Sequence, residues 1–166
     1  MVKKSFTFEP YTFKNYTTLT TQERKIALEF RNKNSAWMVN TEQIDWQSHQ
    51  KWIDDLNTDT STLYYLVFKE NIPFISIDFH DINWQKKEAY WGYFLGDNQF
   101  KSEVLKIEQY IIKIAFEKLH LEKLLCINDI ENHVIGIHKF FGFEEDKVVT
   151  IKGRKFLQMY LKKGDK

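Results

Sequence analysis

Two apolar runs of the sequence carry side chains that can move protons. Asp78 and His80 stand two residues apart, so on a strand they share one face. A carboxylate beside an imidazole can take a proton from an amine directly or through a water molecule. Glu88, at the start of the next run, is a third candidate base. The alternatives are a hydrogen-bonded structural pair for Asp78 and His80, and an exposed strand-end charge for Glu88.

A polar segment in front of a long amphipathic run has the properties of an anion site. Residues 99–104 read Gln-Phe-Lys-Ser-Glu-Val and lead into a helical pattern. The first amides of a helix carry partial positive charge and bind phosphate groups. Ser102 adds a hydroxyl donor and Lys101 a cation. The segment is therefore a candidate phosphate-binding turn, and the alternative is an ordinary capped helix start.

Hydrophobic periodicity predicts the elements that position these residues. Predicted strands span 5–13, with a break at Pro10, and 63–68, 74–79, 89–95, 124–128, 148–152 and 155–162. Predicted helices span 22–31, 46–56, 102–119 and 132–141, with Thr21 and Asp45 as the first two N-caps. The order predicts an α/β (α+β) fold in which a mixed, mostly antiparallel sheet of about seven strands has helices on both faces.

Composition excludes several classes of function. The 166 residues fit one domain, 1–166, and the net charge of +1 lacks the positive field of a nucleic-acid binder. Cys126 is the only cysteine, so no intrachain disulfide or paired-cysteine zinc site can form, and its apolar strand predicts a buried, inert thiol. No metal is expected. The absence of a signal segment or a membrane-spanning run predicts a cytoplasmic protein.

The order of elements resembles the GNAT (Gcn5-related) N-acetyltransferase superfamily from about Phe6 to Leu161. In that superfamily a Gln/Arg-x-x-Gly-x-Gly/Ala turn holds the pyrophosphate of CoA. Gln99 matches this pattern, whereas Ser102 and Val104 replace both glycines. The resemblance implies acetyl-CoA or another short acyl-CoA as co-substrate, without a metal. It assigns CoA contacts to Phe94, Leu95, Gln99, Phe100, Lys101, Ser102, Glu103, Val104, Asn132 and His138.

A second GNAT signature follows in the C-terminal third. Asn132 and the pair Gly142-Phe143 match a strand, Asn, short helix and Gly-Phe pattern. His138 occupies the position of the tyrosine that protonates the CoA thiolate in this superfamily, so the resemblance implies that His138 is the general acid. Imidazole can donate a proton in either charge state. The alternative is a structural histidine on an amphipathic helix.

The N-terminal third resembles nucleotide-sugar N-acetyltransferases of the pseudaminic-acid pathway and related amino-sugar acyltransferases. The resemblance implies acyl transfer to the amine of a nucleotide-linked sugar in surface-glycan biosynthesis, with Arg31 pairing with the diphosphate. It assigns acceptor contacts to Arg31, Asn32, Trp37, Met38, His49 and Tyr90. The alternatives are an intrahelical salt bridge for Arg31 and a core role for the tryptophans.

Two other functions stay open at this stage. A similar Arg-Asn pattern occurs in ribosomal-protein N-acetyltransferases, whose acceptor is a protein amine. A catalytically silent GNAT-like binding module would explain why Tyr90, Ser102, Val104 and His138 all depart from the family pattern. A homodimer is kept as a candidate assembly.

Overall fold

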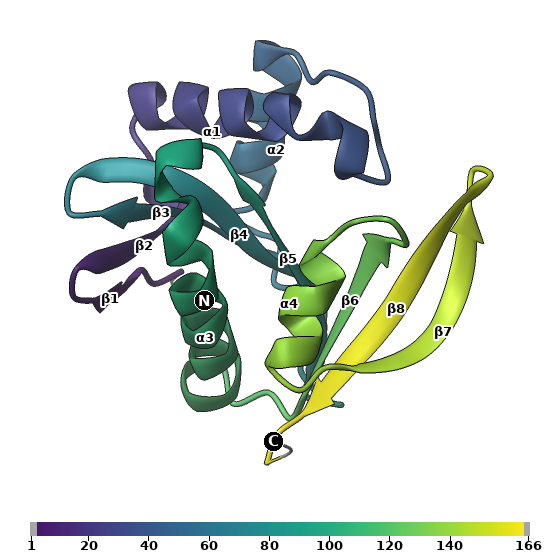
Figure 1. Cartoon of the computed structure of the whole chain (residues 1–166). Helices are drawn as coiled ribbons and strands as arrows, with labels where there is room; N and C mark the ends of the chain where they lie inside the picture. The colour runs from purple at the N-terminus through teal and green to yellow at the C-terminus, as the bar shows by residue number, and fades with distance from the viewer. Residues whose placement is uncertain (1–2, 165–166) are drawn as a thin grey trace.

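The computed structural model describes residues 3–164, which form one eight-stranded sheet in the order β1-β2-β3-β4-β5-β6-β8-β7 (Figure 1). The strands are β1 (Phe6–Phe8), β2 (Tyr11–Asn15), β3 (Leu63–Lys69), β4 (Ile72–Asn83), β5 (Glu88–Leu95), β6 (Lys123–Asp129), β7 (Glu144–Ile151) and β8 (Arg154–Lys162). Among these strands only β5 and β6 pair in parallel. The prediction of a mixed, mostly antiparallel sheet is confirmed. The additional strand arises because the first predicted strand is divided at Pro10 into β1 and β2, which pair with each other.

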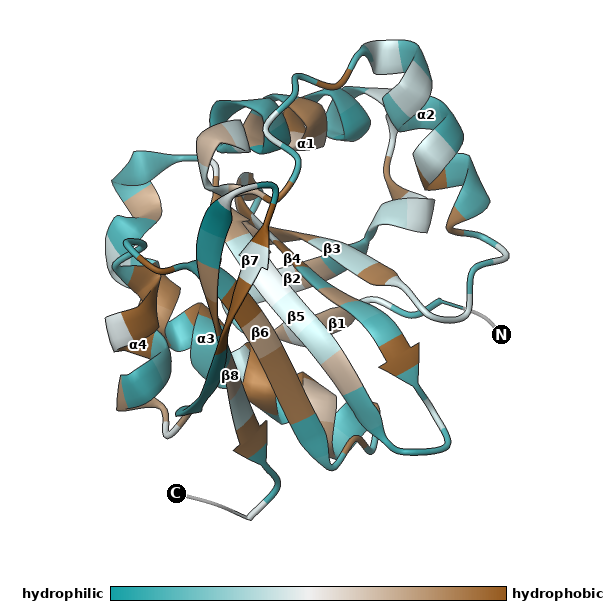
Figure 2. Ribbon diagram, turned by 90° about the vertical axis from the view of Figure 1, so that its right-hand side faces the viewer, coloured by the Kyte–Doolittle hydropathy of each residue, from teal (hydrophilic) through white to brown (hydrophobic). Residues whose placement is uncertain are grey.

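Four α-helices accompany the sheet in the described residues. They are α1 (Thr21–Lys33), α2 (Trp46–Asp55), α3 (Val104–Lys113) and α4 (Val134–Phe140). Side chains of β3 alternate between two apolar clusters, since Tyr65 and Val67 pack with α3 whereas Leu66 packs with α1 and α2. The predicted placement of helices on both faces of the sheet is therefore confirmed. Figure 2 shows the apolar stretch of β6, which lies between β5 and β8 in the sheet.

Some helix boundaries differ from the prediction. Thr20, rather than Thr21, caps α1, and its side chain forms a capping box with Glu23. Asp45 caps α2 as predicted by accepting a hydrogen bond from Ser48 N at 2.8 Å. The helix predicted over 102–119 is divided into three parts. A 3-10 segment, η3 (Asn98–Glu103), precedes α3, and a π-helical segment, η4 (Ile114–Lys118), follows it.

The C-terminal hairpin turns at Gly153 as predicted, where φ is +78°. Its first strand begins at Glu144 instead of Val148. Residues Glu144 and Glu145 are exposed and pair with β8, so the hydrophobic pattern does not mark the start of this strand. No helix within residues 3–164 has both the length and the apolar character needed to cross a membrane.

The strands β5 and β6 separate along their length. Their pairing comprises Glu88 with Lys123, Ala89 with Leu124, and Tyr90 with Leu125. The remainder of β5 stays paired with β4 as far as Leu95 but has no partner in β6. Figure 1 shows the two strands diverging from their shared end. This split in the sheet determines where the candidate site forms.

Candidate active site

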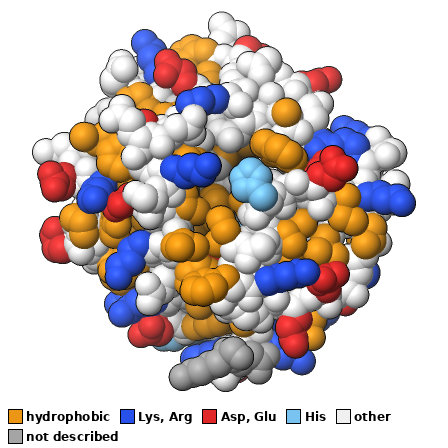
Figure 3. Space-filling view, in the orientation of Figure 1, with side chains coloured by type: hydrophobic (Ala, Val, Ile, Leu, Met, Phe, Trp, Pro, Cys, Tyr) orange, Lys and Arg blue, Asp and Glu red, His pale blue; other side chains and the backbone are white. Residues whose placement is uncertain are grey.

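A cavity of about 910 Å³ occupies the split between β5 and β6. Its wall includes Arg31 and His49 from α1 and α2, and Val104 and Ile137 from α3 and α4. Because these helices lie on opposite faces of the sheet, the cavity passes through the sheet. On the face shown in Figure 3, hydrophobic side chains gather near the middle with basic side chains around them. The helices α1 and α2 thus define one end of the cavity, and α3 and α4 define the other.

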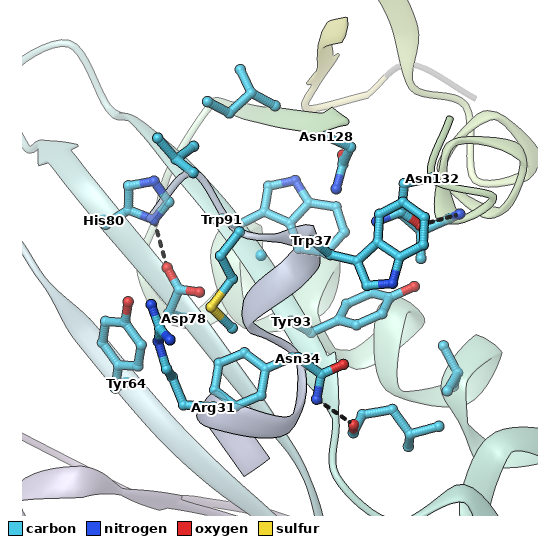
Figure 4. Close-up of a pocket in the computed structure, with 18 of the residues that line it drawn as sticks. Arg31, Asn34, Trp37, Tyr64, Asp78, His80, Trp91, Tyr93, Asn128 and Asn132 are labelled. Carbon is cyan, nitrogen blue, oxygen red and sulfur yellow. Dashed lines mark hydrogen bonds and ion pairs between the residues drawn. The ribbon is translucent and has the colours of Figure 1, made fainter. Parts of the chain in front are cut away.

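Asp78 and His80 lie together on the cavity wall, as Figure 4 shows. Asp78 Oδ2 is 2.5 Å from His80 Nδ1, and burial raises the pKa of the Asp78 carboxyl. Burial alone would lower the pKa of His80, but the hydrogen bond and the charge of Asp78 outweigh it, so the His80 pKa is raised. In residues 3–164, Nε2 of His80 makes no hydrogen bond. The predicted pair thus has the arrangement of an oriented base.

A glycine on the neighbouring strand leaves room for this pair. Gly92 lies opposite Asp78 in the β4–β5 register, and a Cβ atom at Gly92 would stand 3.4 Å from Asp78 Oδ1. Any larger side chain would therefore press on the carboxylate or on an occupant of the cavity beside it. Sequence reasoning used Gly92 only as a landmark of the strand.

Glu88 and Tyr90 are not on the cavity wall. Glu88 lies in the closed part of the sheet, opposite Lys123. Tyr90 Oη donates to Gln158 Oε1 at 3.1 Å, and the Tyr90 ring stacks on His80 with centroids 5.8 Å apart. The structure therefore gives no direct contact between Glu88 and the cavity, and it connects Tyr90 to the site only through the His80 ring.

His138 lies behind the cavity wall. Its side chain is buried, with Nδ1 at 2.9 and 3.0 Å from the two carboxylate oxygens of Glu108, which is itself buried. Ile137 lines the cavity, whereas His138 packs against Trp91 at a centroid distance of 4.8 Å. The role of His138 as general acid stays a prediction, but its position offers no direct path to a ligand in the cavity.

Tyr93 is a polar residue of the site that sequence reasoning missed. It lines the cavity, and its Oη is buried near the Glu108 carboxylate. Burial, followed by the nearby Glu108 carboxylate, raises the pKa of Tyr93, so the hydroxyl remains protonated. The ring lies edge-on to His138, 6.0 Å between centroids. Tyr93 is therefore a hydroxyl-bearing side chain on the cavity wall, whereas His138 lies behind that wall.

Two further polar atoms on the wall are buried and unpartnered in the described residues. Nε1 of Trp91 is a donor, and Oδ1 of Asn128 is an acceptor. Trp91 and Tyr93 alternate with Gly92 and therefore point to the α3 and α4 side of the sheet. Buried polar groups normally have partners, so unpartnered ones at a cavity indicate a polar ligand. The aromatic run of β5 could have suggested these residues, but only the split determines which of them face the cavity.

The predicted CoA-binding residues are only partly brought together. Those on the cavity wall are Phe94, Leu95, Lys101, Val104 and Asn132. Gln99, Phe100, Ser102 and Glu103 are not among the lining residues. Phe100 stacks on Phe74 with centroids 4.9 Å apart, and Glu103 lies 2.9 Å from Lys69 Nζ. Phe100 therefore packs on the core, and Glu103 is engaged in an ion pair.

Four of the predicted acceptor residues line the other end of the cavity: Arg31, Trp37, Met38 and His49. Asn32 does not line it, because its side-chain amide binds both the N–H and the carbonyl of Ile44, at 2.9 and 3.0 Å. Trp37 is 46% exposed, which excludes the core role considered for it. Arg31 makes hydrogen bonds to the carbonyls of Asn40 and Glu42 instead of an intrahelical salt bridge.

His49 is a neutral side chain at this end of the cavity. Burial, followed by the charges of Arg24 and Arg31, lowers its pKa to about 4. Its Nδ1 is buried and has no hydrogen-bond partner in the described residues. A neutral imidazole with a free nitrogen, placed beside a guanidinium, suits a polar, anionic ligand.

Comparison with known proteins identifies relatives over most of the chain. No protein-family model matches. The chain is 31% identical over 140 residues to the acetyltransferase PseH of Campylobacter jejuni serotype O:2, covering 81% of this chain and 87% of that protein. It is also similar to PseH of C. jejuni serotype O:23/36, with 32% identity over 113 residues, 67% of this chain and 69% of that protein.

Solved structures of acetyltransferases are also similar to this chain over most of its length. The crystal structure of C. jejuni PseH in complex with acetyl coenzyme A matches with a TM-score of 0.77 and 26% identity, covering 93% of this chain and 99% of that one. Spermidine N-acetyltransferase from Vibrio cholerae matches with a TM-score of 0.84 at 14% identity, covering 95% of this chain and 98% of that one, which shows a common fold alone. The chain belongs to the PseH family of acetyltransferases, within the GNAT superfamily.

Proposed function

We propose that this protein transfers an acetyl group, or another short acyl group, from CoA to the amino group of a nucleotide-linked amino sugar. The observation that carries the proposal is a cavity that passes through the sheet with the Asp78–His80 pair on its wall. Such a passage lets two substrates enter from opposite faces and meet in the split. We place the reaction in the cytoplasm and in the biosynthesis of surface glycans.

The α3 and α4 end of the cavity suits the acyl donor. Lys101 and the start of η3 offer a cation and helix-terminal amides to the pyrophosphate. The unpartnered Trp91 Nε1 and Asn128 Oδ1 complement the carbonyl and N–H groups of an amide-containing arm. The acetyl-CoA complex of C. jejuni PseH supports this assignment, since that protein matches almost the whole chain.

The opposite end suits a nucleotide-linked amino sugar. Arg31 supplies positive charge for the diphosphate, and His49 supplies a neutral hydrogen-bonding group. The aromatic rings of Trp37, Trp52 and Tyr64 also line the cavity and offer faces for a sugar or a base. The Arg31 guanidinium donates to the carbonyls of Asn40 and Glu42 and, at 3.5 Å, to Asn32 Oδ1, and its remaining N–H groups are the donors available to phosphate.

Proton removal from the acceptor and departure of the thiolate take place on opposite sides of β5. His80 Nε2 accepts a proton from the acceptor ammonium, and Asp78 stabilises the imidazolium that forms. The free amine then forms a bond to the thioester carbonyl carbon while the carbon–sulfur bond breaks. The second amine proton is lost to solvent, and the departing thiolate accepts a hydrogen bond from the Tyr93 hydroxyl before it gains a proton. The products are an amide and free CoA.

The test is a comparison of acceptors with the purified protein and acetyl-CoA. UDP-linked and dTDP-linked amino sugars would be compared with spermidine and with peptides that carry a free N-terminus, following thiol release and acceptor mass. We expect acetylation of an amino sugar, its loss in His80→Gln, and a large decrease of its rate in Asp78→Asn. Acetylation of the peptide or polyamine with unmodified sugars would contradict the proposal, as would acetyl-CoA binding without any turnover.

A further inference from the structure

The segment between α1 and α2 forms part of the acceptor end of the cavity. Trp37, Met38, Val39 and Asn40 lie on the cavity wall, and Figure 4 shows Trp37 reaching toward it. Trp37 and Val39 are 46% and 38% exposed, so packing against the core does not fix this segment. Contacts other than core packing must therefore hold this part of the cavity wall in position.

Two arginines that lie far apart in the sequence, Arg31 and Arg154, bind backbone carbonyls of this segment. Arg31 Nη2 and Nη1 donate to the carbonyls of Asn40 and Glu42, each at 2.7 Å. Arg154 Nη1 donates to the carbonyl of Met38 at 2.6 Å, and Nη2 to that of Ala36 at 3.2 Å. Every second carbonyl from 36 to 42 is thus bound by a guanidinium. Hydrogen bonds from a charged donor are stronger than those from a neutral one.

Arg154 joins this segment to the other half of the sheet. It begins β8, and its Nη2 lies 3.0 Å from Asp129 Oδ2 at the end of β6. Its guanidinium also lies over the Phe156 ring, 4.9 Å from the centroid, and Phe156 lines the cavity. The guanidinium is therefore oriented by a carboxylate and a ring. These contacts connect the segment between α1 and α2, across the cavity, to strands β6 and β8.

We propose that Arg154 is a positioning residue for the acceptor, which acts by holding Trp37 and Met38 in place as the closing wall of the cavity. This inference rests on the proposed function, since it requires that the amine substrate enter from this end. The donor end is formed by η3, α3 and α4, none of which Arg154 contacts. Loss of Arg154 should therefore affect the acceptor and spare acyl-CoA.

The test compares Arg154→Gln with Lys155→Gln, a control at the adjacent, exposed lysine. We expect Arg154→Gln to raise the acceptor KM roughly tenfold through the loss of two charge-assisted hydrogen bonds, with the acetyl-CoA KM within about twofold of the parent. Lys155→Gln should change neither constant. Acrylamide quenching of Trp37 fluorescence, measured as the difference from a Trp37→Phe background, should increase in Arg154→Gln.

Asp129→Asn provides a second variant that keeps the arginine and weakens its orientation. It should raise the acceptor KM in the same direction by a smaller factor, which keeps the inference testable if Arg154→Gln unfolds. An unchanged acceptor KM in folded Arg154→Gln, or an equal rise in both KM values, overturns the inference. A parent protein that acetylates no amine would instead contradict the proposed function, so the two failures are distinguishable.

Discussion

Replacing His138 by Phe tests whether the buried pair with Glu108 stabilises the protein or serves catalysis. The Glu108 carboxylate is 0% exposed, and both of its oxygens lie within hydrogen-bond distance of His138 Nδ1. Phenylalanine fills the space next to Trp91 but leaves the buried Glu108 carboxyl without its imidazole partner. Leaving a buried hydrogen-bonding group without its partner costs roughly 1–3 kcal/mol.

That loss corresponds to a large change in thermal unfolding. For a chain of this size each kcal/mol lowers Tm by about 2–4 °C, so we expect a decrease of about 2–12 °C. The double variant Glu108→Leu/His138→Phe removes both polar groups and should recover most of this decrease, because apolar residues of similar shape can replace both hydrogen-bonding partners at little cost. Thermal unfolding monitored by fluorescence, with and without salt, measures the Tm of the single and the double variant.

Turnover in the same two variants separates the roles of His138. A general acid contributes roughly 10²–10⁴-fold to the rate, so a catalytic His138 predicts that the double variant is stable but nearly inactive. Because His138 lies behind the cavity wall, we expect the double variant to keep kcat within about tenfold of the parent. An unchanged Tm in His138→Phe would refute the reasoning about the buried pair, and a stable, inactive double variant would show that the Glu108–His138 pair is needed for turnover.

Three other predictions concern the cavity. The rate should rise with pH as His80 loses its proton, at a pH above its ordinary pKa of 6.5. Asp78→Asn should move this limb of the kcat/KM profile to lower pH, because the Asp78 carboxylate contributes more than Asp81 to raising the His80 pKa. A limb that stays in place would contradict the pairing. Tyr93→Phe should lower kcat roughly 100-fold with little change in the acetyl-CoA KM, and equal activity would exclude a role for the hydroxyl. Acetyl-CoA at about 100 times its Kd should raise Tm by roughly 5–11 °C, a stabilisation of about 2.7 kcal/mol, and no shift would contradict donor binding.

Local patterns predicted the elements well because each depends on neighbouring residues. Alternation located the strands, and the side chain of Asp45 marked the start of α2. The Asp78–His80 contact was accessible because residues two apart on a strand share a face. These features follow from short stretches of sequence whose geometry is fixed by the backbone.

The rest of the site depends on contacts between distant residues. The separation of β5 from β6 determines that Tyr93 faces a cavity, and no local pattern contains that register. Glu108 lies 30 residues before His138 on another helix, so the sequence could not show that the imidazole is already engaged. Arg154 reaches Met38 across 116 residues for the same reason.

The short β5–β6 pairing also divides the sheet into two units that are joined by a short stretch of strand pairing. Three registered residue pairs connect the strands β1 to β5 with the strands β6 to β8. Regions with few shared hydrogen bonds open at lower free energy than the core around them. The amides of β5 that point away from β4 beyond Tyr90 should therefore exchange with deuterium early. Their protection on binding acyl-CoA would show that the bound donor substrate connects the two units.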